Sequence, residues 1–479
     1  MQDYNQRIIQ ALGDPTDLVV YHLPFSGESE GDGACIFLET LVDRDKIERL
    51  ILKPLLEADR ESRNSEQAAR WIKTVIPIPD IHEAKQFQDC IQGLLGGNCL
   101  LLLGNTENIG FIIDVQKTKH RSISEPTSEV TVRGPREGFN EDLATNISLV
   151  RKRIKNQSLR VESLSVGELT KTKVVILYLE DIAANDLVNE IRKRINSIKT
   201  DSILESSYIE EWIQGKKFNP FPTVLNTERP DVVVSNILEG RIAILTDGTP
   251  MALIGPITFF QLFSTPEDYY QKPDIASLLR ILRLFSFLIA TLTPSVYIAV
   301  VTYHQALLPT SLLISLSAQR EGVPFPGFIE ALMMQIVFEI LREAGLRMPR
   351  IAGQAISIVG ALVIGEAAVQ AGLVSAAMVI VVSLTAIANF VTPAYSFGIT
   401  QRLIQFSFIL LAGFMGMFGI LWGVLLVLLY LASLDSFSIP YLSPFAPTII
   451  SDWKDTAVRA PQQSLQTLPK MLDSNEKKR

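Results

Sequence analysis

The sequence predicts two duplicated α/β lobes followed by a polytopic α-helical membrane domain. Three observations indicate this: long apolar segments lie within residues 276–434, an internal repeat lies within residues 1–275, and a polar tail follows at 435–479. The hydrophobic share of 47% is therefore an average over a soluble part and a very apolar part. With 479 residues, the chain is long enough for two or three domains.

Four apolar segments are the clearest candidates for membrane spans. Each has about 20 or more residues with few charges, which is enough to cross the ~30 Å hydrocarbon layer of a bilayer. Because backbone groups inside a bilayer must bond to one another, we expect helices there. The segments are residues 281–303, 351–370, 373–392 and 403–432. The last is long enough for one tilted helix or for two short helices that break near Gly413, Gly416 or Gly419.

The part before residue 276 contains a duplication. Residues 35–51 (CIFLETLVDRDKIERLI) align with residues 176–192 (ILYLEDIAANDLVNEIR), so that Glu39 matches Glu180. Further along, Gly97 matches Gly240, and an apolar strand and a turn follow both glycines. The offset is about 141 to 143 residues in both comparisons, which indicates a single repeat of a whole lobe.

Each repeat has the same predicted order: two strands, three helices and a closing hairpin. The first lobe (1–120) has strands at 18–22 and 34–39, helices at 45–57, 64–73 and 81–95, and a hairpin of 99–103 with 110–115. The second lobe (159–275) has strands at 159–164 and 174–180, helices at 186–198, 203–214 and 231–238, and a hairpin of 241–245 with 251–254. A basic linker with a helix at 141–155 occupies residues 121–158 between them.

Charge and motifs exclude several classes of function. The net charge of −7 predicts no large basic surface for nucleic acid. No GxxxxGK[ST] or GxGxxG motif is present, and Ser29 in a GxSxG match lies in an acidic loop between two strands rather than on a strand-to-helix elbow. The four histidines are far apart in the sequence. We therefore expect no enzyme activity, no cofactor and no metal.

The flanks of the membrane block predict its orientation. The N-terminus lacks the apolar core of a signal peptide, which favours a cytoplasmic location for both lobes. Lys272, Arg280 and Arg283 surround the entry of the first span, in agreement with the positive-inside rule. Three cysteines in the first lobe, without a CxxC pair, fit a reducing compartment. The basic residues of the linker either bind phosphates or lipid headgroups, or they pair with carboxylates between domains or are simply solvated.

A ladder of small residues marks the second apolar segment as a candidate pore or helix-packing site. Small side chains let helices approach closely in lipid, and the same face can instead border a pore or a neighbouring subunit. A carboxylate at this depth is costly unless it faces protein or water, although it can also lie at the membrane interface. The candidate residues are Gly353, Ser357, Ala361, Gly365, Glu366 and Ala368.

A segment broken by prolines, residues 305–350, precedes that ladder. Its helix at 327–344 places apolar residues on one face and polar residues on another. Such a segment is either a broken helix that lines a cavity or an interfacial helix that lies flat. Glu330 borders the apolar face, and Glu339 and Arg342 are on the polar side. We interpret these three residues as candidates for coupling the membrane helices to the lobes.

Several long motifs, in the same order along the chain, resemble the A subunit of the GerA family of germinant receptors in endospore-forming bacteria. They are RSISEPTSEVTVRGPREGF (121–139), NTERPD (226–231), PEDYY (266–270), HQALLPTSL (304–312), REGVPFP (320–326), LREAGLRMP (341–349) and IVGALVIGEAAVQAG (358–372). The resemblance implies a nutrient-receptor subunit in the inner membrane of the spore. It also implies that A subunits oligomerise into a ligand-gated cation channel.

The resemblance further implies two partners, a transporter-like B subunit that binds the small nutrient and a lipoprotein C subunit. It supplies no catalytic residues. One alternative within the family is an accessory A-like subunit of the dipicolinate-release machinery. A second alternative is a membrane scaffold that does not conduct ions.

Overall fold

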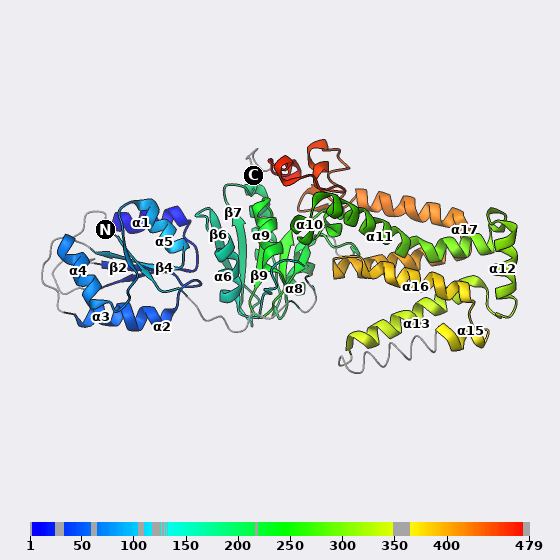
Figure 1. Ribbon diagram of the computed structural model, residues 1–479, viewed down its shortest axis with the longest axis horizontal. Helices are drawn as coiled ribbons and strands as arrows, with labels where there is room; N and C mark the ends of the chain where they lie inside the picture. Colours follow the sequence, from blue (N-terminus) through cyan, green and yellow to red (C-terminus); the bar gives the residue numbers. More distant parts are fainter. Residues whose placement is uncertain are drawn as a thin grey trace. The chain divides into compact units, whose positions relative to one another are not determined.

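The computed structural model describes residues 2–23, 33–58, 65–103, 110–116, 126, 129, 131, 133–215, 219–347 and 365–472 (Figure 1). The chain divides into two compact units. The two-lobe unit comprises Met1–Lys217, Val224–Pro256 and Leu465–Arg479, and the helical unit comprises Phe218–Thr223 and Ile257–Ser464. Residues 435–464, which the sequence analysis assigned to a separate tail, therefore belong to the helical unit.

The first lobe is built on a five-stranded antiparallel sheet with the strand order β1-β2-β4-β5-β3. The strands are β1 (Leu18–His22), β2 (Gly33–Leu38), β3 (Ile81–Ala84), β4 (Asn98–Leu103) and β5 (Gly110–Asp114). The helices are α1 (Gln2–Leu12), α2 (Arg44–Lys46), the π-helix η1 (Ile47–Leu52), α3 (Lys53–Glu57), α4 (Ser65–Val75) and α5 (Phe87–Leu95).

Helices cover both faces of this sheet, so the lobe has three layers (Figure 1). Alternate residues of β2 face opposite layers: Ile36 packs with α1 and α5, whereas Cys35 packs with the helices from η1 to α4. All six residues of β2 are buried, because both faces of a central strand are covered. This explains why the sequence of β2 is a continuous run of apolar residues and does not alternate between apolar and polar residues.

The predicted helix at 81–95 is wrong in its first part. Ile81–Ala84 is the edge strand β3, which pairs with β5 from Ile81↔Ile113 to Ala84↔Gly110. The helix begins only at Phe87, after a capping box in which Gln86 and Asp89 bond to each other's backbone. The strand IHEA has little intrinsic strand propensity, so only its pairing with β5 makes it a strand.

The second lobe repeats the first, with the strand order β6-β7-β9-β10-β8, and confirms the duplication. Its strands are β6 (Leu159–Val166), β7 (Thr172–Leu179), β8 (Leu225–Thr227), β9 (Ile242–Thr246) and β10 (Ala252–Gly255). Its helices are α6 (Leu143–Arg153), α7 (Asn185–Asn196), α8 (Ser206–Ile213) and α9 (Pro230–Leu238). The short edge strand β8 corresponds to β3 and was likewise not predicted.

The glycines aligned from the sequence occupy equivalent places. Gly97 and Gly240 follow the ends of α5 and α9 with φ of 82° and 96°, in the left-handed region that favours glycine. A Cβ on Gly97 would contact Leu41, and a Cβ on Gly240 would contact Ile182, at 3.4 and 3.2 Å. Leu41 and Ile182 are themselves equivalent in the repeat, so the two lobes share backbone detail as well as topology.

A buried ion pair joins the two lobes. Arg151 of α6 donates from Nε and Nη2 to the two carboxylate oxygens of Asp17, at 2.8 and 2.6 Å. The exposed fractions are 2% for Arg151 and 6% for Asp17, so both charges are withdrawn from water. Arg153 pairs with Glu137 at the surface of the same unit. These two linker arginines therefore pair with carboxylates, as one of the two readings of the basic linker predicted.

Glu205 caps the N-terminus of α8 in the second lobe. Its carboxylate accepts hydrogen bonds from the Ser207 amide, the Ser206 hydroxyl and the Thr249 hydroxyl, at 2.5, 2.6 and 2.9 Å. Burial opposes ionisation, but these hydrogen bonds prevail and lower the pKa of Glu205 from 4.5 to about 2. A depressed carboxyl pKa contributes stability that is present above pH 4.5 and is lost as the pH falls towards 2.

We therefore expect Glu205→Gln to destabilise α8 at pH 7 and to reduce its loss of stability in acid. Trp212 lies in α8, so its fluorescence reports the opening of this helix in a protein whose other three tryptophans are replaced by phenylalanine. The exposed Glu211 on the same helix supplies the control, Glu211→Gln. Equal acid transitions in the Glu205→Gln variant and the parent protein would contradict this account of the cap.

The helical unit contains two helices long and apolar enough to cross a membrane, among the residues that the structure describes: α11 (Pro273–Thr302) and α17 (Tyr395–Ala432). The apolar helix α16 (Ala376–Phe390) is shorter. Helices α11 and α17 lie at the predicted spans 281–303 and 403–432, whereas α16 occupies only part of the predicted span 373–392. Most of the predicted span at 351–370 lies outside the described residues. The remaining elements are η2 (Phe259–Phe263), α10 (Glu267–Tyr270), η3 (Gln305–Leu307), α12 (Thr310–Arg320), α13 (Gly327–Arg347), α15 (Ala368–Gln370), β11 (Asp435–Ser436), β12 (Ile439–Pro440), η5 (Ile450–Lys454), η6 (Gln462–Ser464) and, in the two-lobe unit, η7 (Lys470–Leu472).

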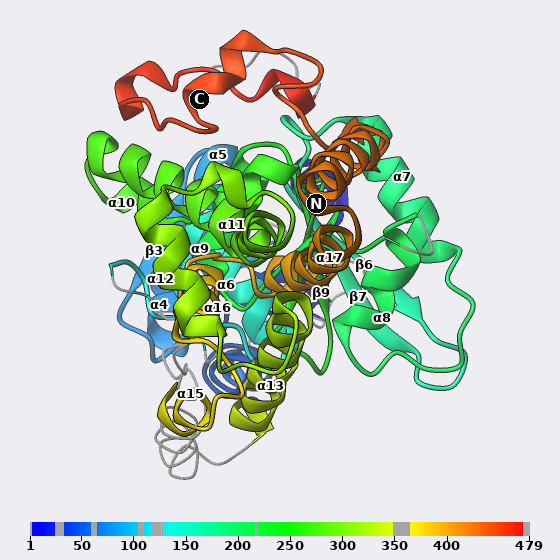
Figure 2. The same ribbon diagram turned by 90° about the vertical axis from the view of Figure 1, so that its right-hand side faces the viewer.

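Helix α17 reverses direction at Gly416, whose φ of 58° and ψ of −141° are not helical. A Cβ on Gly423 would lie 2.9 Å from both Phe408 and Leu411. A straight helix would separate residues 408 and 423 by about 22 Å along its axis. The two halves of α17 are therefore an antiparallel pair, and they lie next to each other in Figure 2. This confirms the second of the two predicted alternatives, with Gly416 as the break.

Ion pairs connect the segment after α17 to the start of α11. Arg280 of α11 contacts the carboxylates of Asp268 and Asp455 at 2.9 and 3.0 Å, and Arg283 contacts Asp268 at 2.9 Å. Arg280 and Asp268 are buried, with exposed fractions of 2% and 1%. The beginning of α11 and the segment after α17 therefore lie at the same end of the helical unit.

Candidate functional site

The predicted small-residue ladder is only partly described. Gly353, Ser357 and Ala361 lie outside the described residues. Gly365, Glu366 and Ala368 are described, and the first two are exposed. Glu366 accepts a hydrogen bond from Gln370 at 3.2 Å, one turn further along. Pore lining or packing by these residues remains a prediction from the sequence.

Glu330, the first of the predicted coupling residues, is fully buried in the helical unit, with an exposed fraction of 0%. Its Oε1 accepts hydrogen bonds from both the amide and the hydroxyl of Ser375, each at 2.5 Å. Ser375 is the N-cap of α16 and accepts a bond from the Met378 amide at 3.3 Å. Glu330 therefore joins α13 to the start of α16 through two hydrogen bonds.

The second oxygen of Glu330 is buried and has no hydrogen-bond partner among the described residues. The hydroxyl of Tyr297, on α11, is buried near Glu330, Ser375 and Arg320. Helices α11, α12 and α13 and the start of α16 thus supply polar groups to a single cluster, which we call the Glu330 cluster: Glu330, Ser375, Tyr297 and Arg320. An unpaired buried carboxylate oxygen is costly and is typical of a site that holds water or a cation.

The other two coupling candidates lie further along α13 and contact α17. Glu339 pairs with Arg342 on its own helix, and Nε of Arg402 on α17 lies 3.6 Å from Oε1 of Glu339. One turn earlier on α13, the buried Gln335 accepts a hydrogen bond from the buried Gln405 of α17 at 3.1 Å. Helix α13 is therefore tied to α16 near its beginning and to α17 further on.

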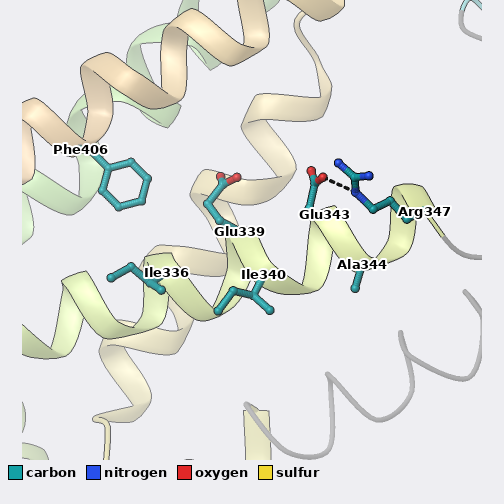
Figure 3. A pocket seen from close by; sticks show the side chains of 7 residues that line it. All are labelled: Ile336, Glu339, Ile340, Glu343, Ala344, Arg347 and Phe406. Carbon is teal, nitrogen blue, oxygen red and sulfur yellow. Dashed lines mark hydrogen bonds and ion pairs between the residues drawn. The ribbon is translucent and has the colours of Figure 1, made fainter.

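A groove of about 600 Å³ runs along the same part of α13 (Figure 3). Glu339 forms part of it, and Glu343 pairs with Arg347 at 2.7 Å at its far end. The groove is lined by Ile336, Glu339, Ile340, Glu343, Ala344 and Arg347 from α13 and by Phe406 from α17. No group of three or more metal-ligating side chains occurs among the described residues.

The partners of these candidates were not predicted from the sequence: Ser375, Tyr297 and Arg402. A signal for one of them was present, because Arg402 directly precedes an apolar segment. Polar residues within membrane-type segments usually face protein or water and mark function. Ser375 gives no such signal, since a serine before a helix is a common cap.

These features define the class of protein: a duplicated α/β unit continued by an apolar helical unit with two candidate membrane spans and buried polar contacts between its helices. The chain belongs to the GerA family. The family profile described as "Bacillus/Clostridium GerA spore germination protein" matches residues 6–471. The resemblance found from the sequence motifs is thereby confirmed.

Relatives in several bacilli support the assignment. Spore germination protein KA of Bacillus subtilis strain 168 is 43% identical over 98% of this chain and 86% of its own length. Spore germination protein GerLA of Bacillus cereus is 39% identical over 98% of this chain and 95% of its own length. An uncharacterized membrane protein of Bacillus subtilis, YfkQ, is 42% identical over 92% and 86%.

A solved structure also matches. It is the N-terminal domain of the A subunit of the Bacillus megaterium spore germinant receptor GerK3, at 33% identity. The match covers 54% of this chain and 95% of that domain, with a TM-score of 0.42.

Proposed function

We propose that this chain is the A subunit of a germinant receptor in the inner membrane of the spore, with its two lobes in the cytoplasm. In this proposal, small nutrients trigger germination through a receptor in which A subunits oligomerise and conduct cations. The names of the relatives and the candidate spans support the receptor and its membrane location. The transporter-like B subunit and the lipoprotein C subunit are the expected partners.

The observation that supports conduction most directly is the Glu330 cluster. A carboxylate with an exposed fraction of 0% lies between apolar helices and has one oxygen without a partner among the described residues. In a bilayer, such a group faces the interior of the helix bundle or a water-filled cavity. Its hydrogen bonds to Ser375 also make it sensitive to any movement of α13 relative to α16.

Helix α13 is the element that transmits the signal in this proposal. It contacts α16 through Glu330 and α17 through Gln335 and Glu339. A shift of α13 would therefore alter the hydration of the Glu330 cluster and the packing of α17 together. The first alternative, an accessory subunit of the dipicolinate-release machinery, would use the same helices without responding to nutrients.

The test is nutrient-triggered cation flux into liposomes that contain the complete receptor. We expect Glu330→Gln to reduce the flux strongly, because the variant lacks the negative charge of the site while keeping its shape. Glu343→Gln is the matched control, since Glu343 lies on the same helix in an exposed pair with Arg347. Flux that is unchanged by Glu330→Gln would contradict the role of this carboxylate, and absence of any current in planar bilayers would favour the scaffold alternative.

A further inference from the structure

Helix α8 of the second lobe has an apolar outer face. Tyr208 and Trp212, four residues apart on α8, have exposed fractions of 43% and 47%, and Leu204, which lies just before the helix, has an exposed fraction of 66%. The inner face of the helix carries Ile209 and Ile213, both fully buried. A helix that packs on a lobe with one apolar face normally has a polar outer face, so the outer face of α8 requires an explanation.

The duplication provides an internal control for this face. With the offset of 141 residues found for the strands, the first lobe has Arg63 and Gln67 at the positions of Leu204 and Tyr208. Trp71 of α4 is the counterpart of Trp212, and its exposed fraction is 8%. The same helix position thus holds a buried tryptophan in the first lobe and a largely exposed one in the second. The apolar outer face is therefore a property of the second lobe and not of the fold.

The second lobe is also the one from which the chain enters the helical unit. Asn219 follows α8 closely and belongs to the helical unit, where Tyr430 near the end of α17 donates a hydrogen bond to its side chain at 3.1 Å. Trp212 precedes Asn219 by only seven residues of sequence, so α8 lies directly before the entry of the chain into the helical unit.

The charges around this face suit the headgroup region of a bilayer. Glu205 bonds to its own lobe, and burial raises the pKa of Glu210 to about 7, so that this carboxyl is partly neutral at physiological pH. Glu211 is exposed, and Lys216 and Lys217 follow the helix in the sequence. Tryptophan, tyrosine and flanking lysines are the residues that concentrate at membrane surfaces.

We propose that the outer face of α8, formed by Tyr208 and Trp212 and extended by Leu204 just before the helix, rests in the headgroup region of the cytoplasmic leaflet. This inference rests on the proposed membrane location of the helical unit. The contact would hold the second lobe against the bilayer. In the first lobe the counterpart of Trp212 is the buried Trp71, which is not available for such a contact.

The test uses the complete chain in nanodiscs and its own tryptophans. Two single-tryptophan proteins retain either Trp212 or Trp422, which lies within the candidate span α17. We expect lipids brominated near the headgroups to quench Trp212, and acrylamide in the water to quench it only weakly. Trp422 reports whether the helical unit is in the bilayer at all, independently of α8.

Each outcome decides the proposal. Quenching of Trp422 by brominated lipid, together with quenching of Trp212 by acrylamide alone, would overturn the contact of α8 while leaving the membrane location intact. Trp212 shielded from both quenchers would also overturn it, and would indicate that a second copy or a partner protein covers the face. If Trp422 were not quenched by lipid, the membrane location itself would be wrong and the inference would fail with it.

A second measurement avoids the replacement of the buried Trp71. Wild-type protein and the single variant Trp212→Phe are compared in the same nanodiscs, and the difference between their emission isolates Trp212. We expect this difference signal to be lost in brominated lipid. A difference signal that persists in brominated lipid would contradict the proposal.

Discussion

Replacing Arg151 by alanine is expected to lower the stability of the contact between the two lobes by about 3–5 kcal/mol. The arginine neutralises Asp17, which is 6% exposed and cannot move into water while the lobes remain packed. The variant would leave Asp17 with a hydrogen bond from the Thr40 hydroxyl, at 2.6 Å, in place of its cation. Hydrogen exchange of the amides of β1 and β6 in the full-length protein measures the effect.

The control for this prediction is Arg153→Ala on the same helix. The Arg153 pair with Glu137 is partly exposed, with side-chain exposed fractions of 22% and 45%, so we expect a change of at most about 1 kcal/mol. In Arg151→Ala, exchange in β1 and β6 should accelerate about a hundredfold or more, since 1.4 kcal/mol corresponds to a factor of about ten. Equal exchange in the two variants would show that the buried pair does not hold the lobes together.

Replacing Glu330 by alanine is the second change with a large expected effect. It removes the acceptor of two hydrogen bonds at the start of α16, and bonds to a charged group contribute roughly 1.5–3 kcal/mol each. We expect α16 to open more readily by about 3 kcal/mol or more. Hydrogen exchange of the first turn of α16, in protein held in nanodiscs, measures this opening.

Ser375 tests whether the effect arises from this contact. Ser375→Ala removes the hydrogen bond from the Ser375 hydroxyl to Glu330, and it also removes the acceptor of the Met378 amide. The two single variants therefore both lose the Ser375–Glu330 hydroxyl bond. We expect the double variant to be destabilised by less than the two single variants together, because neighbouring residues are coupled. Strictly additive effects would indicate that Glu330 stabilises α16 by another route.

The sequence predicted the duplication because the matching residues occur within short stretches of the chain. The matched glutamates Glu39 and Glu180 and the matched glycines Gly97 and Gly240 lie at equivalent places in two sheets of identical strand order. The glycine match is informative because a left-handed backbone is strongly unfavourable for other residues. The central strands were predicted for a similar reason, since a strand covered on both faces consists of apolar residues.

The errors occur where pairing overrides local preference. The edge strands β3 and β8 are short, with four and three residues, and their sequences are not typical of strands. Their backbone groups are bonded only because β5 and β10 lie beside them. A prediction from local composition has no access to such a neighbour.

For each buried polar contact, the sequence predicted only one of the two residues. Glu330, Glu339 and Arg342 could be proposed because charged residues in or beside apolar segments need a polar or aqueous environment. Their partners Ser375 and Arg402 lie 45 residues from Glu330 and 63 residues from Glu339, and nothing local connects them. Similarly, the sequence offered three glycines for the break in the last span, and packing between its two halves selected Gly416.

By itself, the sequence determined the family, the duplication, the positions of the apolar helices and the carboxylates that need to face protein or water. These follow from periodicity, composition and motifs, which are properties of short stretches of chain. The tertiary structure alone decided which carboxylate contacts which helix, which arginine joins the lobes and which of two equivalent tryptophans stays exposed. Those outcomes depend on contacts between distant residues, whose energies exist only once the chain has folded.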